Sequence, residues 1–333
     1  MPTPPLRDDR PKMQRALNAW AEADHNYTAG ASILGIDTGT FRHQVGTALA
    51  EGLSPEIGQT KPRIRVPARS VYQPMPNEFG KPVRVFVFGC AHDAPNIPDK
   101  SRFRHAGLLA SELKPDFIVD LGDSLDLDSL SHHALPGSVD DHQRPFFTAE
   151  VQSLTEAYAA FHETAPSPDE VPRYHLHGNH ENRAWRHEAN NPASTGVFTT
   201  QIDQVFARMG WTIKAYREWL FIEGVGFIHV PINLAGREYG GKTIDNTLLN
   251  EITFSVCWSH THRRQLSHRA KVGIGNALQS FNTGSFMPMG YVKQYAGLST
   301  TGWTYGAHEM TLRDGQIESV RTWSTKELEE RYA

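Results

Sequence analysis

The chain has 333 residues, 39% of them hydrophobic and 21% charged, and a formal net charge of −4 at pH 7. This composition excludes a disordered chain, and the length suits one large domain with a small accessory domain. A slightly acidic balance provides no general attraction to nucleic acid, so such binding must come from local basic patches. With two cysteines and no apolar run long enough for a signal sequence or a membrane span, we expect a cytoplasmic protein without membrane contact.

The first expected element is a small all-α domain over residues 1–53. Ala31 is followed by Gly35, Ile36 and Phe41, and this order of small, glycine, apolar and aromatic residues is typical of a helix-turn-helix. In this interpretation Ala31 permits a close crossing of two helices and Gly35 supplies the turn. Ile36 and Phe41 would fill the core between the helices.

The second helix of this motif would carry the residues that contact DNA. Asp37 is suited to cap it, and its exposed side chains are our candidates for nucleic-acid binding: Thr38, Thr40, Arg42 and His43. The consensus is weak and also occurs in other helical pairs, so a module that docks a protein partner stays an open alternative. Helix-turn-helix modules commonly act as dimers, which leaves a homodimer open as well.

Residues 54–82 contain six prolines and few apolar periods, which predicts an extended linker. Its stretch 61–69 has four basic residues and no acidic one. Arg63 and Arg65 are therefore further candidates for contacts with a phosphate backbone, although a solvated linker explains the charges equally well.

Strands and helices alternate from residue 83 onward. Apolar runs predict strands at 83–89, 117–121 and 173–177, separated by helical patterns at 101–114 and about 147–163. Between residues 211 and 322 most of the predicted elements are consecutive strands. This succession predicts an α/β (α+β) domain over residues 83–333, a two-sheet sandwich flanked by helices.

Five short stretches rich in metal-ligand residues follow these strands. In chain order they are Cys90-Ala91-His92, Gly122-Asp123-Ser124-Leu125-Asp126, Gly178-Asn179-His180-Glu181, His229 and Ser259-His260-Thr261-His262. Together they supply enough oxygen, nitrogen and sulfur donors for two ions side by side, the arrangement that drives in-line phosphoryl displacement.

This series resembles the calcineurin-like metallophosphoesterase family, whose pattern is D-x-H, G-D-x-x-D, G-N-H-[DE], a lone H and G-H-x-H. The resemblance covers about residues 83–322, and four of the five stretches match in type, order and strand-end context. The residues at 178–183 and 260–263 are most similar to those of phosphoesterases carried by bacteriophages and prophages. The resemblance implies a hydrolase with a dinuclear metal site.

The resemblance also implies a role for each residue, with seven metal ligands: Cys90, His92, Asp123, Asn179, His229, His260 and His262. Asp123 would bridge the two cations, and water between them would lose a proton and become the nucleophile. His180 would be the general acid, and Asp126 would orient it through a carboxylate–imidazole hydrogen bond. Arg183 would hold a phosphate oxygen.

Cys90 departs from the family pattern, which has aspartate at this position. A thiolate ligand favours Zn, Fe or Mn over Mg or Ca, so we expect two divalent transition metals, manganese ahead of iron or zinc. Alternatively Cys90 is a spectator beside a weak first site, or the site is degenerate. The neighbouring Asp93 is a further candidate oxygen donor.

These features predict a metal-dependent phosphodiesterase, a nuclease acting on DNA or, second, on RNA. The N-terminal domain and the linker would deliver the substrate, and a second basic cluster would line the mouth of the site: Arg263, Arg264, Arg269 and Lys271. Two alternatives stay open. One is a small-molecule phosphatase or phosphodiesterase with an N-terminal partner-binding domain, and the other is a catalytically inactive DNA-binding regulator.

Overall fold

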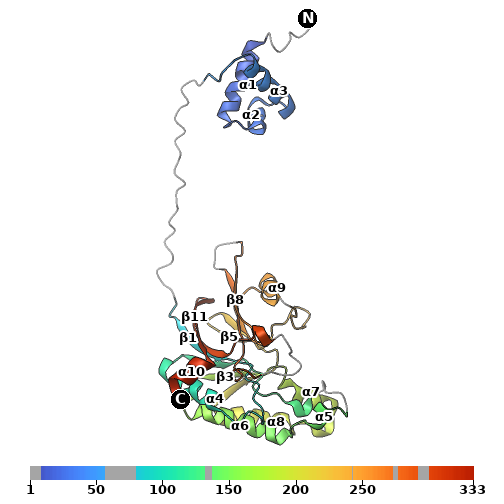
Figure 1. Ribbon diagram of the computed structural model, residues 1–333, viewed down its shortest axis with the longest axis vertical. Coiled ribbons are helices and arrows are strands. Elements are labelled where there is room, and N and C mark those ends of the chain that lie inside the picture. The colour runs from blue at the N-terminus through green and yellow to red at the C-terminus, as the bar shows by residue number, and fades with distance from the viewer. Residues whose placement is uncertain (1–8, 57–79, 132–136, 242, 273–276, 292–299) are drawn as a thin grey trace. The chain divides into compact units, whose positions relative to one another are not determined.

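The computed structural model describes residues 9–56, 80–131, 137–241, 243–272, 277–291 and 300–333. The chain divides into two compact units, Met1–Met75 and Pro76–Ala333, and each is described by itself (Figure 1). Most of the predicted linker, including Arg63 and Arg65, lies outside the described residues. Within the described ranges, no helix combines the length and the apolar character that crossing a membrane requires.

The first unit consists of three helices, α1 (Arg10–Glu22), α2 (Tyr27–Leu34) and α3 (Thr38–Ala50). Gly35 ends α2 with a left-handed φ of 65°, a conformation that glycine adopts without steric cost. The Asp37 side chain then caps α3 by accepting from the Thr40 N–H at 2.8 Å. Phe41 is fully buried, and Ile36 packs half-buried against the same small core.

The second unit contains two β-sheets. The six-stranded sheet has the order β11-β10-β1-β2-β3-β4, with β1 (Val83–Phe88), β2 (Phe117–Asp120), β3 (Arg173–Leu176), β4 (Trp211–Lys214), β10 (Gly306–Arg313) and β11 (Gln316–Ser324). The five-stranded sheet has the order β5-β6-β7-β9-β8, with β5 (Leu220–Ile222), β6 (Val225–Phe227), β7 (Val256–Trp258), β8 (Arg264–Arg269) and β9 (Leu278–Thr283). Strands β1 to β4 are mutually parallel, and so are β6, β7 and β9.

Alternating side chains on β1 show how the layers pack. Phe86 and Phe88 point into a core shared with the helices α4 (Ser101–Leu113), α6 (Phe147–His162) and α8 (Thr199–Arg208). Val85 and Val87 point the opposite way, into a core shared with the five-stranded sheet. This order of helices, sheet and sheet confirms the expected sandwich.

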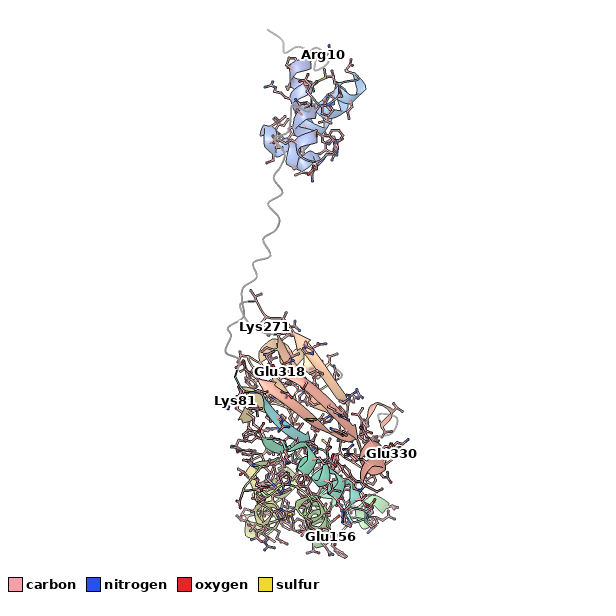
Figure 2. All side chains as sticks on the ribbon, turned by 90° about the vertical axis from the view of Figure 1, so that its left-hand side faces the viewer. Arg10, Lys81, Glu156, Lys271, Glu318 and Glu330 are labelled. Carbon is pink, nitrogen blue, oxygen red and sulfur yellow. The ribbon has the colours of Figure 1, made fainter. Side chains whose placement is uncertain are left out.

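Two further helices pack on this unit, one on the outer side of the five-stranded sheet and one at the end of the chain. α9 (Ile244–Glu251) packs on β7 through Leu248 and Val256, and α10 (Thr325–Tyr332) joins the core under α4 through Leu328. Figure 2 shows Glu156 of α6 and Lys271, just beyond β8, at opposite ends of this unit.

Short elements complete the unit: the 3-10 turns η2 (Asp128–Leu130) and η3 (Pro192–Ser194), and the helices α5 (Val139–His142) and α7 (Asn182–Asn190). Our sequence patterns did not predict α5, α7 or α10. Glu150 of α6 is buried and holds η2, because its carboxylate accepts from the Asp128 N–H at 2.6 Å and the Ser129 N–H at 3.3 Å.

Replacing Glu150 with glutamine is expected to flatten the pH dependence of stability. Burial raises the pKa of Glu150 from 4.5 to about 7. The folded chain therefore binds more protons than the unfolded chain between these values, and the free energy of unfolding falls as pH rises through this window, by on the order of 2–3 kcal/mol. Glu150→Gln removes this titration. Urea unfolding at pH 5 and pH 8 measures the effect, with Glu156→Gln, exposed on the same helix, as the control. Equal pH slopes in the two variants would contradict the expectation.

Candidate metal centre

All seven predicted ligands lie in loops that leave the carboxyl ends of strands. Three of these loops follow β1, β2 and β3 of one sheet, and two follow β6 and β7 of the other. The carboxyl ends of parallel strands meet at one edge of a sheet, where open α/β sheets bind their ligands. The strand topology therefore gathers side chains that are far apart in the sequence.

Asp123 lies at the middle of this group. Its Oδ2 is 3.2 Å from His229 Nε2, 3.8 Å from His92 Nε2 and 3.9 Å from His180 Nε2. Burial raises the pKa of Asp123, but the attraction of His229 and His180 prevails and holds it well below its usual value. Asp123 is therefore an ionised, buried carboxylate that faces three imidazoles.

A first group of predicted ligands combines the imidazoles of His229 and His260 with the Asn179 amide. His229 Nδ1 donates to the Leu121 carbonyl at 2.7 Å, which leaves Nε2 as the ligand nitrogen, 3.0 Å from Asn179 Oδ1. Although burial opposes it, the Asp123 carboxylate raises the pKa of His229. The surroundings of the His229 ring therefore favour a positive charge, whether a proton or a metal cation. His260 Nδ1 is buried without a hydrogen-bond partner among the described residues, as expected of a nitrogen that binds a metal.

A second group combines two imidazoles and a thiol. His92 Nδ1 is 3.0 Å from Asp126 Oδ1, and since a carboxylate only accepts, Nδ1 carries the proton and Nε2 is free to bind a metal. His92 Nε2 lies 3.0 Å from His262 Nε2. Cys90, His92 and His262 form one of three groups of buried donors, among the described residues, whose ligand atoms lie within 4.8 Å of one another. These residues fit a metal ion.

Cys90 belongs to two of the three groups, since its sulfur also lies near Asp123 and His229. The Sγ atom is 3.0 Å from Ser259 Oγ and accepts from the His260 N–H at 3.2 Å. Burial, and then the Asp123 charge, raise the pKa of the Cys90 thiol well above its usual value. The thiol is therefore neutral by itself, and only a bound cation would make it a thiolate ligand.

The suggestion that Asp93 supplies an oxygen is wrong. Its buried carboxylate is bonded to Lys100 Nζ at 2.5 Å, Arg102 Nη2 at 2.6 Å and Ser153 Oγ at 2.5 Å. These partners compensate its charge within the protein, so Asp93 is no candidate ligand.

The backbone at the site is strained. Five of the seven predicted ligands have a left-handed φ although none is glycine: Cys90 (52°), His92 (43°), Asp123 (52°), His260 (75°) and His262 (61°). This conformation costs an L-residue about 1–2 kcal/mol. Strain of this kind concentrates at functional sites, where the surrounding structure holds it in place.

Asp126 contacts His180 in a different way from the one expected. His180 Nδ1 donates to the backbone carbonyl of Asp126 at 2.7 Å, while the carboxylate Oδ1 lies 3.8 Å from that nitrogen and 3.0 Å from His92. The carboxylate is therefore a partner of His92. Burial lowers the pKa of His180 well below its usual value, so a neutral His180 keeps the lone pair on Nε2.

Arg183 contacts the loop after β2. Its Nη1 donates to the Asp126 carbonyl at 2.9 Å and to Asp128 Oδ1 at 3.1 Å. The side chain thus fixes the same carbonyl that holds His180. The predicted contact with a phosphate oxygen stays a prediction.

Glu181 is a functional residue that our sequence reasoning missed. Its buried carboxylate accepts from three backbone N–H groups, those of Asp123 (3.0 Å), Ser124 (2.6 Å) and Gly178 (2.8 Å). It therefore ties the loop after β2 to the loop after β3. The only signal in the sequence was its place at the end of the Gly-Asn-His-Glu stretch.

The predicted nucleic-acid contacts belong to the other unit. Thr40, Arg42 and His43 are exposed on α3, and Thr38 is half-buried. In the basic cluster near β8, Lys271 Nζ donates to the Leu249 carbonyl at the end of α9. The roles of these residues stay predictions.

Comparisons with known proteins add structural likenesses. No family model matches the sequence, and no curated protein matches it. Among solved structures, the chain is similar to Yfce, a phosphoesterase from E. coli (13% identity, 72% of this chain and 98% of that one, TM-score 0.33). It is also similar to Vacuolar Protein Sorting 29 from Cryptosporidium parvum (15%, 74% and 100%, TM-score 0.34). A third likeness is to purple acid phosphatase PPD1 from yellow lupin (11%, 75% and 55%, TM-score 0.38). These TM-scores are low, so we base the proposed function on the residues of this chain.

Replacing Gly178 with alanine is expected to disrupt the centre. A Cβ there would lie 2.1 Å from Asp123 Oδ1 and 2.6 Å from Asp123 N, so the loop after β2 must shift. We expect Gly178→Ala to bind Mn²⁺ at least tenfold more weakly, as measured by competition with a chelator. Gly240→Ala is the control, because a Cβ there meets open space. Wild-type affinity in Gly178→Ala would contradict this account of the loop.

Proposed function

We propose that the protein is a metal-dependent phosphoesterase with a dinuclear site centred on Asp123. The observation that carries the proposal is the set of ligand atoms around this buried carboxylate, with His229 Nε2 at 3.2 Å and His92 Nε2 at 3.8 Å from Asp123 Oδ2. His92, Asp123, His262 and Cys90 would hold the first cation. Asp123, Asn179, His229 and His260 would hold the second.

The order of these residues along the chain supports phosphoryl chemistry. They follow the calcineurin-like metallophosphoesterase pattern in order, with Cys90 as the exception. Two bound cations would neutralise phosphate oxygens and lower the pKa of a bound water. The soft sulfur donor and the imidazoles favour transition metals, with manganese ahead of iron or zinc.

His180 would transfer a proton to the leaving oxygen of the substrate. The Asp126 carbonyl takes the Nδ1 proton, and Arg183 holds that carbonyl, so the ring keeps one orientation with Nε2 toward the Asp123 side. Nε2 can then take up a proton, and it donates one to the leaving oxygen when the ring is doubly protonated.

We further propose that the substrate is nucleic acid, DNA ahead of RNA. The support is the first unit, where α2, a short turn and α3 follow a helix-turn-helix pattern and expose Thr40, Arg42 and His43. A small phosphoester is the second candidate, with the first unit binding a protein partner instead.

Metal content of Cys90 variants tests the dinuclear site. After loading with Mn²⁺, we expect two ions per chain in the wild type and in Cys90→Asp. Cys90→Ala should lose one ion, because Cys90 groups with His92 and His262, the other proposed ligands of the first cation. Elemental analysis with the hydrolysis of bis(p-nitrophenyl) phosphate measures both properties. Two tightly bound ions in Cys90→Ala would make Cys90 a spectator, and fewer than one in the wild type would contradict the proposal.

A double replacement on α3 tests the substrate. We expect Arg42→Ala/His43→Ala to raise the KM for DNA several-fold and to make its salt dependence shallower, because fewer phosphates are neutralised. Turnover of bis(p-nitrophenyl) phosphate should be unchanged. Arg15→Ala, exposed on α1, is the matched control. Equal KM values for DNA in all variants would favour a partner-binding role.

A further inference from the structure

A second buried carboxylate, Asp120, lies at the end of β2, three residues before Asp123. Its Oδ1 accepts from the Gly122 N–H at 3.0 Å, and its Oδ2 accepts from the Ser124 hydroxyl at 2.7 Å. Gly122 and Ser124 flank Asp123 in the chain. The Asp120 carboxylate thus binds the backbone of the residue before Asp123 and the side chain of the residue after it.

Two groups from other elements hold Asp120 in turn. The hydroxyl of Tyr158, on α6, donates to Asp120 Oδ2, and His175 Nδ1, on β3, lies 2.7 Å from the same oxygen. The Tyr158 hydroxyl is also 2.6 Å from Ser124 Oγ. All four side chains are fully buried. The His175 ring stacks on Phe206 of α8, with centroids 3.6 Å apart, so the helical layer fixes this group as well.

This arrangement acts on the strained residue at the site. Asp123 has a left-handed φ of 52°, which costs free energy and persists where the surrounding structure holds it. Glu181 holds the N–H groups of Asp123 and Ser124, and Asp120 holds Gly122 and the Ser124 hydroxyl. The two buried carboxylates together therefore hold residues 122–124, and they share Ser124, which each of them binds through a different atom.

We propose that Asp120, with Tyr158 and His175 bound to it, is a positioning group that sets the Asp123 carboxylate for both cations. The inference rests on the proposed function, because it takes Asp123 as the shared ligand. Groups that orient a metal ligand typically change metal affinity 10–100-fold when they are removed. Asp120, Tyr158 and His175 act through the loop and are positioning residues.

Tyr158→Phe is the most selective test. The Tyr158 ring packs among Phe103, Phe206 and Trp211, so phenylalanine keeps the packing and removes only the hydroxyl. The matched control is Tyr239→Phe. Tyr239 is also buried and its hydroxyl bonds Glu251 at 2.6 Å, in the core beside α9. Each variant loses one buried hydroxyl, but only Tyr158 is connected to Asp123.

The measurements are Mn²⁺ affinity by chelator competition, the urea midpoint, and kcat and KM at limiting and saturating Mn²⁺, all on the full chain. We expect Tyr158→Phe to bind Mn²⁺ about tenfold more weakly. Its kcat should be low at limiting Mn²⁺ and recover at saturation with KM unchanged. Tyr239→Phe should bind Mn²⁺ as the wild type does. Equal affinities in the two variants and the wild type would overturn the inference.

Ser124→Ala provides a second route if Tyr158→Phe does not fold. It should weaken Mn²⁺ binding in the same direction, and the double variant should lose less than the sum of the two single losses, because both hydroxyls act through Asp120. Additive losses would count against a common group. A wild type that binds Mn²⁺ but hydrolyses no phosphoester would contradict the proposed function and leave this comparison of affinities intact.

Discussion

The site depends on keeping one negative charge, that of Asp123, in a buried place and in a backbone conformation that aspartate disfavours. Three imidazole nitrogens within 3.9 Å stabilise the charge. Glu181 stabilises the conformation by accepting from backbone N–H groups in the loop after β2 and in the loop after β3. The sheets and helices provide the rigid frame that these hydrogen bonds need, because a mobile loop would relax the strain.

The layout of the fold could be predicted because it follows from short-range patterns, whereas the candidate ligands were named from the resemblance of five short stretches to a family pattern. Apolar runs that alternate with helical periods indicate strands, and β1, β2 and β3 are within a few residues of their predicted ranges. Polar residues directly after parallel strands must meet at one edge. This rule places His92 and Asp123 near each other, but His229 follows a strand of the other sheet, and only the family resemblance named it as a candidate ligand.

The supporting contacts could not be predicted, because they are choices between groups that look equivalent in the sequence. Asp126 has both a carbonyl and a carboxylate that can reach an imidazole, and the fold gives the carbonyl to His180 and the carboxylate to His92. Asp93 is next to a ligand in sequence, yet Lys100 and Arg102 neutralise it. Such outcomes depend on loop direction and on long-range packing, which periodicity does not encode.

The ligands come from both sheets, and this division has a mechanical consequence. Loops from the six-stranded sheet supply Asp123 and Asn179, while loops from the five-stranded sheet supply His229 and His260. The interface between the sheets combines an apolar core with a few hydrogen bonds, such as those that Gln279 of β9 makes with the backbone of Ile317 of β11 at 2.6 and 2.8 Å. Cations bound by ligands from both sheets would cross-link the two sheets. The ions would then stabilise the fold as well as supply the chemistry. Their loss would weaken the attachment of one sheet to the other.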